Sequence, residues 1–320
     1  MLARETVDRA SELRADPEWL DAAWARPETR VLVVDHGRAV ARMTGVRAEL
    51  VFLPPSQAPP GLRFLLGVDD ERIAYFGVAA PLPGTDAGAP AGGRGTGPGR
   101  DGQAAGDDVP RPVSLREAGS LLGDRDAGLL THAVALANWH DTHTHCPIDG
   151  TPTVVNPGGH STTCPADGTE HFPRTDPAVI MLVSDPEDRC LLARNKAWPQ
   201  GRVSILAGFV DPGESAEHAV IREVHEEIGV AVERVTYLGS QPWPLPRSLM
   251  LGYRAHAVGD LTIRVDADEI SEARWYSRDE LIGVLAAGKL ALPPAVSIAR
   301  RIIEAWYGGE LPDGASAWTR

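Results

Sequence analysis

The sequence predicts an α+β protein, and three features support this prediction. Short apolar runs with strand character alternate with helical patterns in both the N-terminal and the C-terminal parts of the chain. The length of 320 residues allows for about two domains, because single domains contain roughly 100–200 residues. Residues 140–174, between the two parts, are rich in His, Cys, Pro, Gly and Thr and contain few long apolar side chains. We therefore expect two α+β parts separated by a small module that lacks a hydrophobic core.

The N-terminal part is predicted to be a small α+β domain over residues 1–139. The expected strands are residues 30–34, 49–53, 63–68 and 72–78, and the expected helices are residues 114–119 and 127–139. Residues 83–110 consist mainly of Gly, Ala, Pro and Asp. Such a segment cannot bury enough apolar surface to fold, so it is predicted to be a flexible insertion.

The C-terminal part is predicted to be a second domain over residues 175–310. An Asp-Pro-Glu-Asp turn joins its first two strands. The expected strands are residues 178–183, 189–193, 203–206, 235–240, 250–257 and 273–277, and the expected helices are residues 215–228, 279–287 and 295–307.

The composition excludes several classes of protein. The formal net charge of −13 argues against tight nonspecific binding to nucleic acid, which needs clustered Lys and Arg. No apolar run approaches the roughly 18–20 residues that span a bilayer, so no membrane partner is expected. Three cysteines do not make a disulfide framework, and the first twenty residues contain no apolar signal segment. We expect a cytoplasmic enzyme or binding protein.

The strongest motif lies in the helix expected at residues 215–228. Ser215 is a plausible N-cap, and Gly229 stands where a helix end favours a left-handed residue. Glu223, Glu226 and Glu227 are spaced i, i+3 and i+4, so their carboxylates share one helix face. Three like charges suit a hard divalent cation, Mg²⁺ or Mn²⁺. By themselves they would favour a solvated acidic helix face over a metal site.

The full spacing resolves this ambiguity. Gly208 is followed after five residues by Glu214, and after seven more by Arg-Glu-Val-His-Glu-Glu-Ile-Gly-Val, residues 222–230. This pattern closely resembles the Nudix box, which identifies the chain as a member of the Nudix hydrolases. The resemblance implies an α/β/α sandwich with a mixed sheet and metal-dependent hydrolysis of nucleoside diphosphate derivatives. It also implies residue roles. The metal ligands would be Ala207 (through its carbonyl), Glu223, Glu227 and Glu269, the catalytic residues Glu226 and Glu227, and the residues that shape the box Gly208, Glu214, Arg222 and Gly229.

A second motif follows the box. Residues 240–248 read Ser-Gln-Pro-Trp-Pro-Leu-Pro-Arg-Ser, and the three prolines predict a rigid extended segment rather than a paired strand. The segment resembles the signature of the NADH pyrophosphatase branch of the Nudix family, with Leu245 where that branch usually has Phe. The resemblance implies hydrolysis of NADH and NAD⁺ to nicotinamide mononucleotide and AMP, and removal of NAD caps from RNA 5′ ends.

The same resemblance implies a set of substrate-binding residues. Phe209 would stack on the nicotinamide, and Phe172 would close it from the second subunit of a homodimer. Arg116 would reach the substrate from the N-terminal domain. The full set is Arg116, Phe172, Phe209, Gln241, Pro242, Trp243, Pro244, Leu245, Pro246, Arg247, Ser248 and Ala299.

The His/Cys-rich module resembles a zinc ribbon that has lost some of its cysteines. The family carries two Cys-x-x-Cys pairs. At the positions of the first pair this chain has His143 and Cys146, and at those of the second pair it has Cys164 and Asp167. All four side chains can bind zinc, although Asp is uncommon in structural sites. The sequence leaves two alternatives open: a module that binds Zn²⁺, or one that has lost its metal.

Two other functions compete with the NADH pyrophosphatase interpretation. One is a Nudix enzyme for ADP-ribose or another dinucleotide, which residues 240–248 argue against. The other is a noncatalytic Nudix module that senses a nucleotide, which the complete set of box carboxylates argues against.

Overall fold

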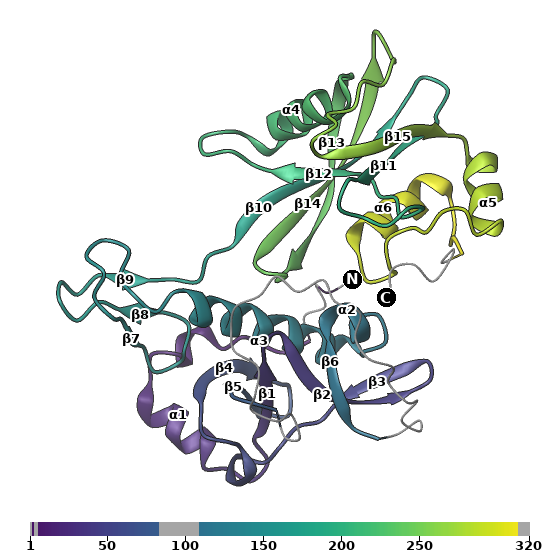
Figure 1. Cartoon of the computed structure of the whole chain (residues 1–320). Helices are drawn as coiled ribbons and strands as arrows, with labels where there is room; N and C mark the ends of the chain where they lie inside the picture. The colour runs from purple at the N-terminus through teal and green to yellow at the C-terminus, as the bar shows by residue number, and fades with distance from the viewer. Residues whose placement is uncertain (1, 3–5, 83–108, 313–320) are drawn as a thin grey trace. The chain divides into compact units, whose positions relative to one another are not determined.

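The chain forms two compact units in the computed structural model, which describes residues 2, 6–82 and 109–312 (Figure 1). Among the described residues, the N-terminal unit comprises residues 6–82, 109–174 and 244–246, and the C-terminal unit comprises residues 2, 175–243 and 247–312. The predicted insertion at residues 83–110 lies outside the described residues except for its last two. No helix among the described residues is long and apolar enough to cross a membrane.

The N-terminal unit is built on a six-stranded sheet with the order β3-β2-β1-β5-β4, in which β6 also pairs with β2. β1 and β5 are parallel, and the other pairs are antiparallel. The strands are β1 Arg30–Asp35, β2 Arg38–Thr44, β3 Arg47–Leu50, β4 Leu62–Val68, β5 Ala74–Ala79 and β6 Arg111–Ser114. The helices are α1 Pro17–Trp24, α2 Leu115–Ala118 and α3 Asp124–Thr142, with short 3₁₀ turns at Ser11–Leu13 and Pro55–Gln57.

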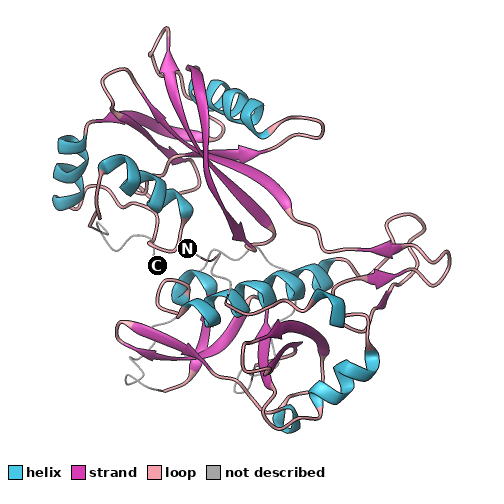
Figure 2. Ribbon diagram, turned by 180° about the vertical axis from the view of Figure 1, so that it is seen from behind, coloured by secondary structure: helices cyan, strands magenta, loops and turns pink. Residues whose placement is uncertain are grey.

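Two helices of this unit bury its sheet. The long helix α3 lies beside the strands in Figure 2 and packs on β1 and β4. Leu20 and Ala23 of α1 join Leu65 and Phe76 of the sheet in one buried cluster. The sequence analysis missed α1 and β2. Asp16 accepts a hydrogen bond from the Trp19 amide as the N-cap of α1, and Pro17 follows as the first helical residue, which is a local start signal that the sequence does carry.

The His/Cys-rich module extends this unit as a small three-stranded sheet, β7 Val154–Val155, β8 Thr162–Thr163 and β9 Glu170–His171. Its loop between β7 and β8 is hydrogen-bonded to the edge strand β4. The Leu65 amide donates to the Gly158 carbonyl at 3.1 Å, and the His160 ring lies 2.7 Å from the Leu65 carbonyl. The loop thereby satisfies both backbone groups of Leu65, which would otherwise face the open edge of the sheet.

The C-terminal unit is an α/β/α sandwich, which confirms the predicted fold class. Its mixed sheet has the order β13-β14-β10-β11-β15, with β12 paired to β10. β10 runs parallel to β14 and antiparallel to β11 and β12. The strands are β10 Asp176–Ser184, β11 Cys190–Asn195, β12 Leu206–Phe209, β13 Ala231–Trp243, β14 Ser248–Val258 and β15 Ile270–Tyr276, and the helices are α4 Ala216–Ile228, α5 Arg278–Ala286 and α6 Ile298–Tyr307.

Successive side chains of β10 point to opposite faces of the sheet and so enter the two cores of this sandwich. Val179 and Met181 belong to the core cluster that includes the apolar side of α4. Ile180 and Leu182 belong to the opposite cluster, with α5 and α6. Figure 1 shows α4 on one side of the sheet and α5 and α6 on the other. Because both faces of β10 are covered, the strand reads as a continuous apolar run.

One expectation about this unit is wrong. Residues 240–243 do pair as a strand: Pro242 lies opposite Leu249 and Trp243 opposite Ser248 in the β13–β14 ladder. β13 is an edge strand, where the donor that proline lacks can face the unpaired side. Only residues 244–247 form the turn.

We predict that His160 makes the stability of the N-terminal unit sensitive to acid. Burial, together with the nearby charges of Arg14, Arg9 and His140, lowers the pKa of His160 to about 4, although the hydrogen bond to Leu65 opposes this shift. The pKa of His160 is lower in the folded protein than in the unfolded chain. Its contribution to the free energy of unfolding is therefore complete above about pH 6.5 and is lost as the pH falls toward 4. Between about pH 7.5 and about pH 5 the wild type should lose about 2 kcal/mol more unfolding free energy than His160→Gln in urea titrations.

The matched control is His36→Asn in the same unit, because the His36 side chain is 79% exposed. This variant should keep the acid sensitivity of the wild type. Equal pH profiles for the wild type and His160→Gln would contradict the prediction.

Candidate active site

Arg222, on α4, organises the loop that precedes this helix. Its Nε and Nη2 donate to the two carboxylate oxygens of Glu214 at 2.9 and 2.8 Å. Nη2 also donates to the Phe209 carbonyl at 2.9 Å. Nη1 donates to Glu223 at 2.8 Å and to Glu226 at 2.9 Å. One guanidinium therefore ties the end of β12 and the Glu214 loop to the acidic face of the helix.

These contacts keep the side chains of Arg222 and Glu214 charged. The Arg222 hydrogen bond, followed by one from the Asp211 amide, lowers the pKa of Glu214 to about 2. In return, Glu214 and then the helix carboxylates raise the pKa of Arg222. Both side chains of the pair are therefore ionised at neutral pH.

Two caps fix the ends of α4, and one loop brings a further acidic residue to its C-terminal end. The Ser215 side chain accepts from the His218 amide at 3.2 Å, and Gly229 ends the helix with φ +70°, so both predicted caps are present. At the C-terminal end, the Asp266 amide donates to the Glu227 carbonyl at 2.9 Å. This hydrogen bond anchors the loop that carries Glu269 beside Glu227.

Glu227 is the most strongly perturbed acid of the C-terminal unit. Its residue is 6% exposed, and its Oε2 finds no hydrogen-bond partner among the described residues. Burial, followed by the charges of Glu223, Glu269 and Glu226, raises the pKa of Glu227 to about 8. Burial also raises the pKa of Glu223, although Arg222 opposes this. Buried, mutually repelling carboxylates with an orphaned oxygen fit a divalent metal with oxygen ligands.

A pocket of about 750 Å³ opens beside these acids. Glu223 and Glu269 line it from α4 and the loop before β15, and Phe209, 60% exposed, lines it from the end of β12. Lys196 is the only basic residue among the described residues of its lining. The remaining lining residues are Ala178, Asn195, Ala197, Ala207, Gly208, Asp211, Ser248, Met250 and Asp268. An exposed aromatic side chain and two acidic side chains, Glu223 and Glu269, thus line the same cavity.

The N-terminal unit holds a separate cluster of metal-binding side chains. One ligand atom from each of Cys146, Asp149, Cys164 and Asp167 lies within 4.8 Å of every other. The structure thus brings together three of the four predicted zinc ligands. It corrects the fourth: His143 is outside the cluster, with Nδ1 3.1 Å from the Trp139 carbonyl at the end of α3.

Comparisons with known proteins agree with this geometry. Residues 174–303 match the NUDIX domain, and residues 141–172 match the NADH pyrophosphatase zinc ribbon domain. The chain is 42% identical over 324 residues to a Mycobacterium tuberculosis protein named NAD-capped RNA hydrolase NudC, with 97% of this chain and 95% of that protein covered. The chain belongs to the Nudix hydrolases.

Two further similarities cover less of the chain. A human protein named NAD-capped RNA hydrolase NUDT12 is 42% identical over 209 residues, which cover 62% of this chain and 44% of the human protein. The crystal structure of a NUDIX hydrolase from Nitrosomonas europaea is 20% identical with a TM-score of 0.41, and covers 52% of this chain and 95% of its own.

Several predicted substrate residues of this Nudix hydrolase do not line the pocket. Gln241 is fully buried, and its amide donates to the Val296 carbonyl at 2.7 Å and accepts from the Ile298 amide at 2.6 Å. Its polar atoms are thus used to hold the start of α6, where Ala299 is also buried. Pro242 and Trp243 are half-buried in β13, and Arg247 pairs with Asp176 at 2.6 Å. The pocket is lined instead by Ser248 and Phe209 from the predicted set.

The other predicted substrate residues belong to the N-terminal unit. Arg116 lies in α2, Phe172 is 63% exposed just after β9, and Pro244, Leu245 and Pro246 form the turn that groups with this unit. Their substrate roles stay predictions.

The sequence analysis missed Lys196 and Asp149. Lys196 follows β11, and its amide donates to the Glu269 carbonyl at 2.8 Å, which places a cation beside the acidic site. It is one of only two lysines in the chain, but nothing local links it to the Nudix box. For Asp149 a signal existed: Cys-Pro-x-Asp-Gly-Thr occurs at 146–151 and again at 164–169.

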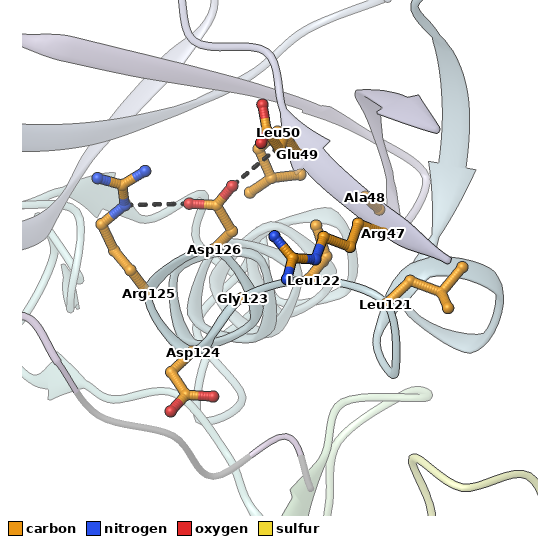
Figure 3. A pocket seen from close by; sticks show the side chains of 10 residues that line it. All are labelled: Arg47, Ala48, Glu49, Leu50, Leu121, Leu122, Gly123, Asp124, Arg125 and Asp126. Atoms are coloured by element: carbon orange, nitrogen blue, oxygen red, sulfur yellow. Dashed lines mark hydrogen bonds and ion pairs between the residues drawn. The ribbon is translucent and has the colours of Figure 1, made fainter. Parts of the chain in front are cut away.

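A second pocket, of about 490 Å³, lies in the N-terminal unit (Figure 3). Figure 3 shows the Asp126 carboxylate between Arg125 and the Leu50 backbone. It accepts from the Leu50 amide at 2.9 Å and from Arg125 Nε at 3.0 Å. This buried acid therefore joins α3 to β3, which is a structural role.

We predict that Gly208→Ala disables the site without unfolding the protein. A Cβ at Gly208 would overlap the Glu223 carboxylate, and the mobile end of that side chain would move away from its position. Displacing a metal ligand by about 1 Å can reduce turnover by about a hundredfold, whereas the melting temperature should change by no more than about 2 °C. Steady-state kinetics and thermal unfolding measure both effects.

Gly283→Ala in α5 is the control, because nothing lies within 4 Å of the added methyl group. It should keep full turnover. Full turnover in Gly208→Ala would mean that Glu223 does not need its present position.

Proposed function

We propose that this Nudix hydrolase cleaves the pyrophosphate bond of NADH and NAD⁺ to nicotinamide mononucleotide and AMP, and removes NAD caps from RNA 5′ ends. The observation that carries the proposal is that Glu223 and Glu269, whose charges act on the buried Glu227, line one pocket together with the exposed Phe209. The relatives named NAD-capped RNA hydrolases and the match to the NADH pyrophosphatase zinc ribbon support this choice of substrate.

A divalent metal, Mg²⁺ or Mn²⁺ in this proposal, would be held by Glu223, Glu227, Glu269 and the Ala207 carbonyl. When bound, it supplies positive charge that polarises the diphosphate and makes water a better nucleophile. These residues fit that ion because their carboxylates repel one another and one oxygen of Glu227 lacks a partner among the described residues.

The side chains around the proposed metal site have different roles in the reaction. Arg222 keeps Glu223 and Glu226 in place through its Nη1. Glu226 or Glu227 takes the proton of the attacking water. Lys196, whose side chain is 61% exposed and lies 4.0 Å from Asp268, provides a cation for a phosphate oxygen. Phe209 offers a flat surface for the nicotinamide.

The proposal includes three statements about the whole protein. Zn²⁺ binds to the His/Cys-rich module of residues 140–174, which matches the zinc ribbon domain. The enzyme is a homodimer in which Phe172 reaches the nicotinamide of the partner subunit, which light scattering of the purified protein tests. Its location is the cytoplasm, and its three cysteines are free thiols, as expected in a reducing compartment.

Glu227→Gln should abolish hydrolysis and preserve the fold. The amide matches the shape of the carboxyl group but carries no charge, so it binds a divalent cation weakly and does not act as a base. Release of AMP from NADH in Mg²⁺ should therefore fall by roughly a hundredfold or more. The buried carboxylate is costly in the absence of metal, so the metal-free variant should be at least as stable as the wild type.

Glu217→Gln is the control, since Glu217 is exposed in the first turn of the same helix. It should hydrolyse NADH like the wild type. Near-normal turnover in Glu227→Gln would refute the assignment, and absence of Mg²⁺-dependent AMP release in the wild type would favour the noncatalytic sensor.

Phe209→Ala should raise the KM for NADH by about tenfold, because stacking on an aromatic side chain contributes about 1–3 kcal/mol. Phe209→Trp should keep the wild-type KM. ADP-ribose has no nicotinamide, so its KM should not change. An equal rise for both substrates would show that Phe209 does not contact the nicotinamide.

Two comparisons decide among the remaining substrates. Faster turnover of ADP-ribose than of NADH would favour the alternative pyrophosphatase. Turnover of NADH and NAD-capped RNA at equal metal and salt concentrations establishes which is preferred, because binding of RNA phosphates depends on salt.

A further inference from the structure

The module of residues 143–173 is built from two copies of one turn. In the first, the Cys146 amide donates to the Thr151 carbonyl and the Gly150 amide to the Cys146 carbonyl, at 2.8 and 2.9 Å. In the second, Cys164, Thr169 and Gly168 make the same two bonds at the same distances. Gly150 and Gly168 have φ +76° and +78°. The repeated Cys-Pro-x-Asp-Gly-Thr sequence therefore folds the same way twice.

Each turn presents one sulfur and one carboxylate to the same point. Asp149 Oδ1 accepts from the Thr151 amide and Asp167 Oδ1 from the Thr169 amide, both at 2.8 Å. These bonds fix each carboxylate and leave its Oδ2 for another partner. Cys164 Sγ lies 3.7 and 3.9 Å from the two oxygens of Asp149.

The module has almost no core to hold these turns together. Of residues 143–173, all of which the structure describes, only Cys146 and Cys164 are buried apolar side chains. The larger apolar side chains Ile148, Val154 and Phe172 are exposed. A fold of this size with so little buried apolar surface needs a disulfide or a metal, and both cysteines are free thiols.

The donor spacing fits zinc. The four ligand atoms lie within 4.8 Å of one another, slightly more than the roughly 3.3–3.8 Å between donors around a tetrahedral Zn²⁺. The two aspartates are exposed, so small side-chain rotations suffice to close this gap.

We propose that Cys146, Asp149, Cys164 and Asp167 bind one Zn²⁺, one thiolate and one carboxylate from each turn, in a site that releases its metal more readily than an all-thiolate site. This inference rests on the proposed presence of metal in the module and adds its ligands and its lability. With zinc bound, the site carries the same net charge as an all-thiolate site, so the carboxylates change its softness and not its charge. Softer thiolates hold Zn²⁺ more firmly than oxygen ligands do.

The site would also hold the N-terminal sheet. The loop between the two turns provides the Gly158 carbonyl and the His160 ring to Leu65 on β4. Loss of the metal would free this loop and expose the edge of β4. The metal would therefore stabilise the N-terminal unit rather than take part in hydrolysis.

The first experiment measures zinc in the full-length protein, purified with excess Mg²⁺ to occupy the carboxylate site of the C-terminal unit. We expect one zinc per chain in the wild type and in the control His143→Ala, and its loss in Asp149→Ala and in Asp167→Ala. Co²⁺ substitution should give a thiolate charge-transfer band that His143→Ala keeps. Loss of zinc in His143→Ala, or full zinc with an unchanged Co²⁺ spectrum in Asp149→Ala, would overturn the ligand assignment.

The second experiment strengthens the site and does not depend on damaged variants. The double variant Asp149→Cys/Asp167→Cys should transfer zinc to a chromogenic chelator about tenfold more slowly, or slower still. Chelation should increase amide exchange in β4 of the wild type and leave β10 unchanged. An equal transfer rate, or absence of zinc in both the wild type and the double variant, would refute the inference. NADH turnover measured in the same samples shows separately whether the proposed function holds.

Discussion

The active site of this Nudix hydrolase depends on one guanidinium group. Arg222 holds Glu214, the Phe209 carbonyl, Glu223 and Glu226 at 2.8–2.9 Å. These groups come from the end of a strand, a loop and a helix, and only a planar, permanently charged donor with five N–H groups can reach all of them. A lysine would contribute one point charge and would leave the loop untied.

Arg222 also reduces the free-energy cost of placing several carboxylates on one face of α4. Carboxylates at i and i+4 repel each other, and burial adds to the cost of keeping them charged. Arg222 offsets this cost for Glu223 and Glu226. It does not do so for Glu227, whose Oε2 is buried and has no hydrogen-bond partner in the described part of the chain. The remaining cost is electrostatic repulsion, which the proposed divalent cation would relieve. The same arrangement would therefore provide both affinity for the metal and charge for the proposed reaction.

The N-terminal unit solves a different physical problem. Its six-stranded sheet is buried by α1 and α3, whereas the module next to it has two buried cysteines in place of a core. Two identical turns bring their side chains to one point, and the loop between them covers the edge of β4. Because stability there depends on a few local contacts, we expect it to respond to acid and to the proposed metal, unlike the stability of the C-terminal core.

The sequence alone determined the Nudix helix, its caps at Ser215 and Gly229 and the shared face of its glutamates, because helical periodicity and capping are local properties. The layered fold of the C-terminal unit was implied by the resemblance of the Nudix box, and the structure shows the matching feature in β10, which is covered on both faces. Tertiary structure decided which distant residues join the site: Lys196 and Glu269 arrive through loops, and Gln241 is turned away to hold α6. It likewise decided that Asp149 and not His143 faces the second cysteine. These positions depend on strand pairing and on loop closure between segments far apart in the chain, which spacing along the sequence does not encode.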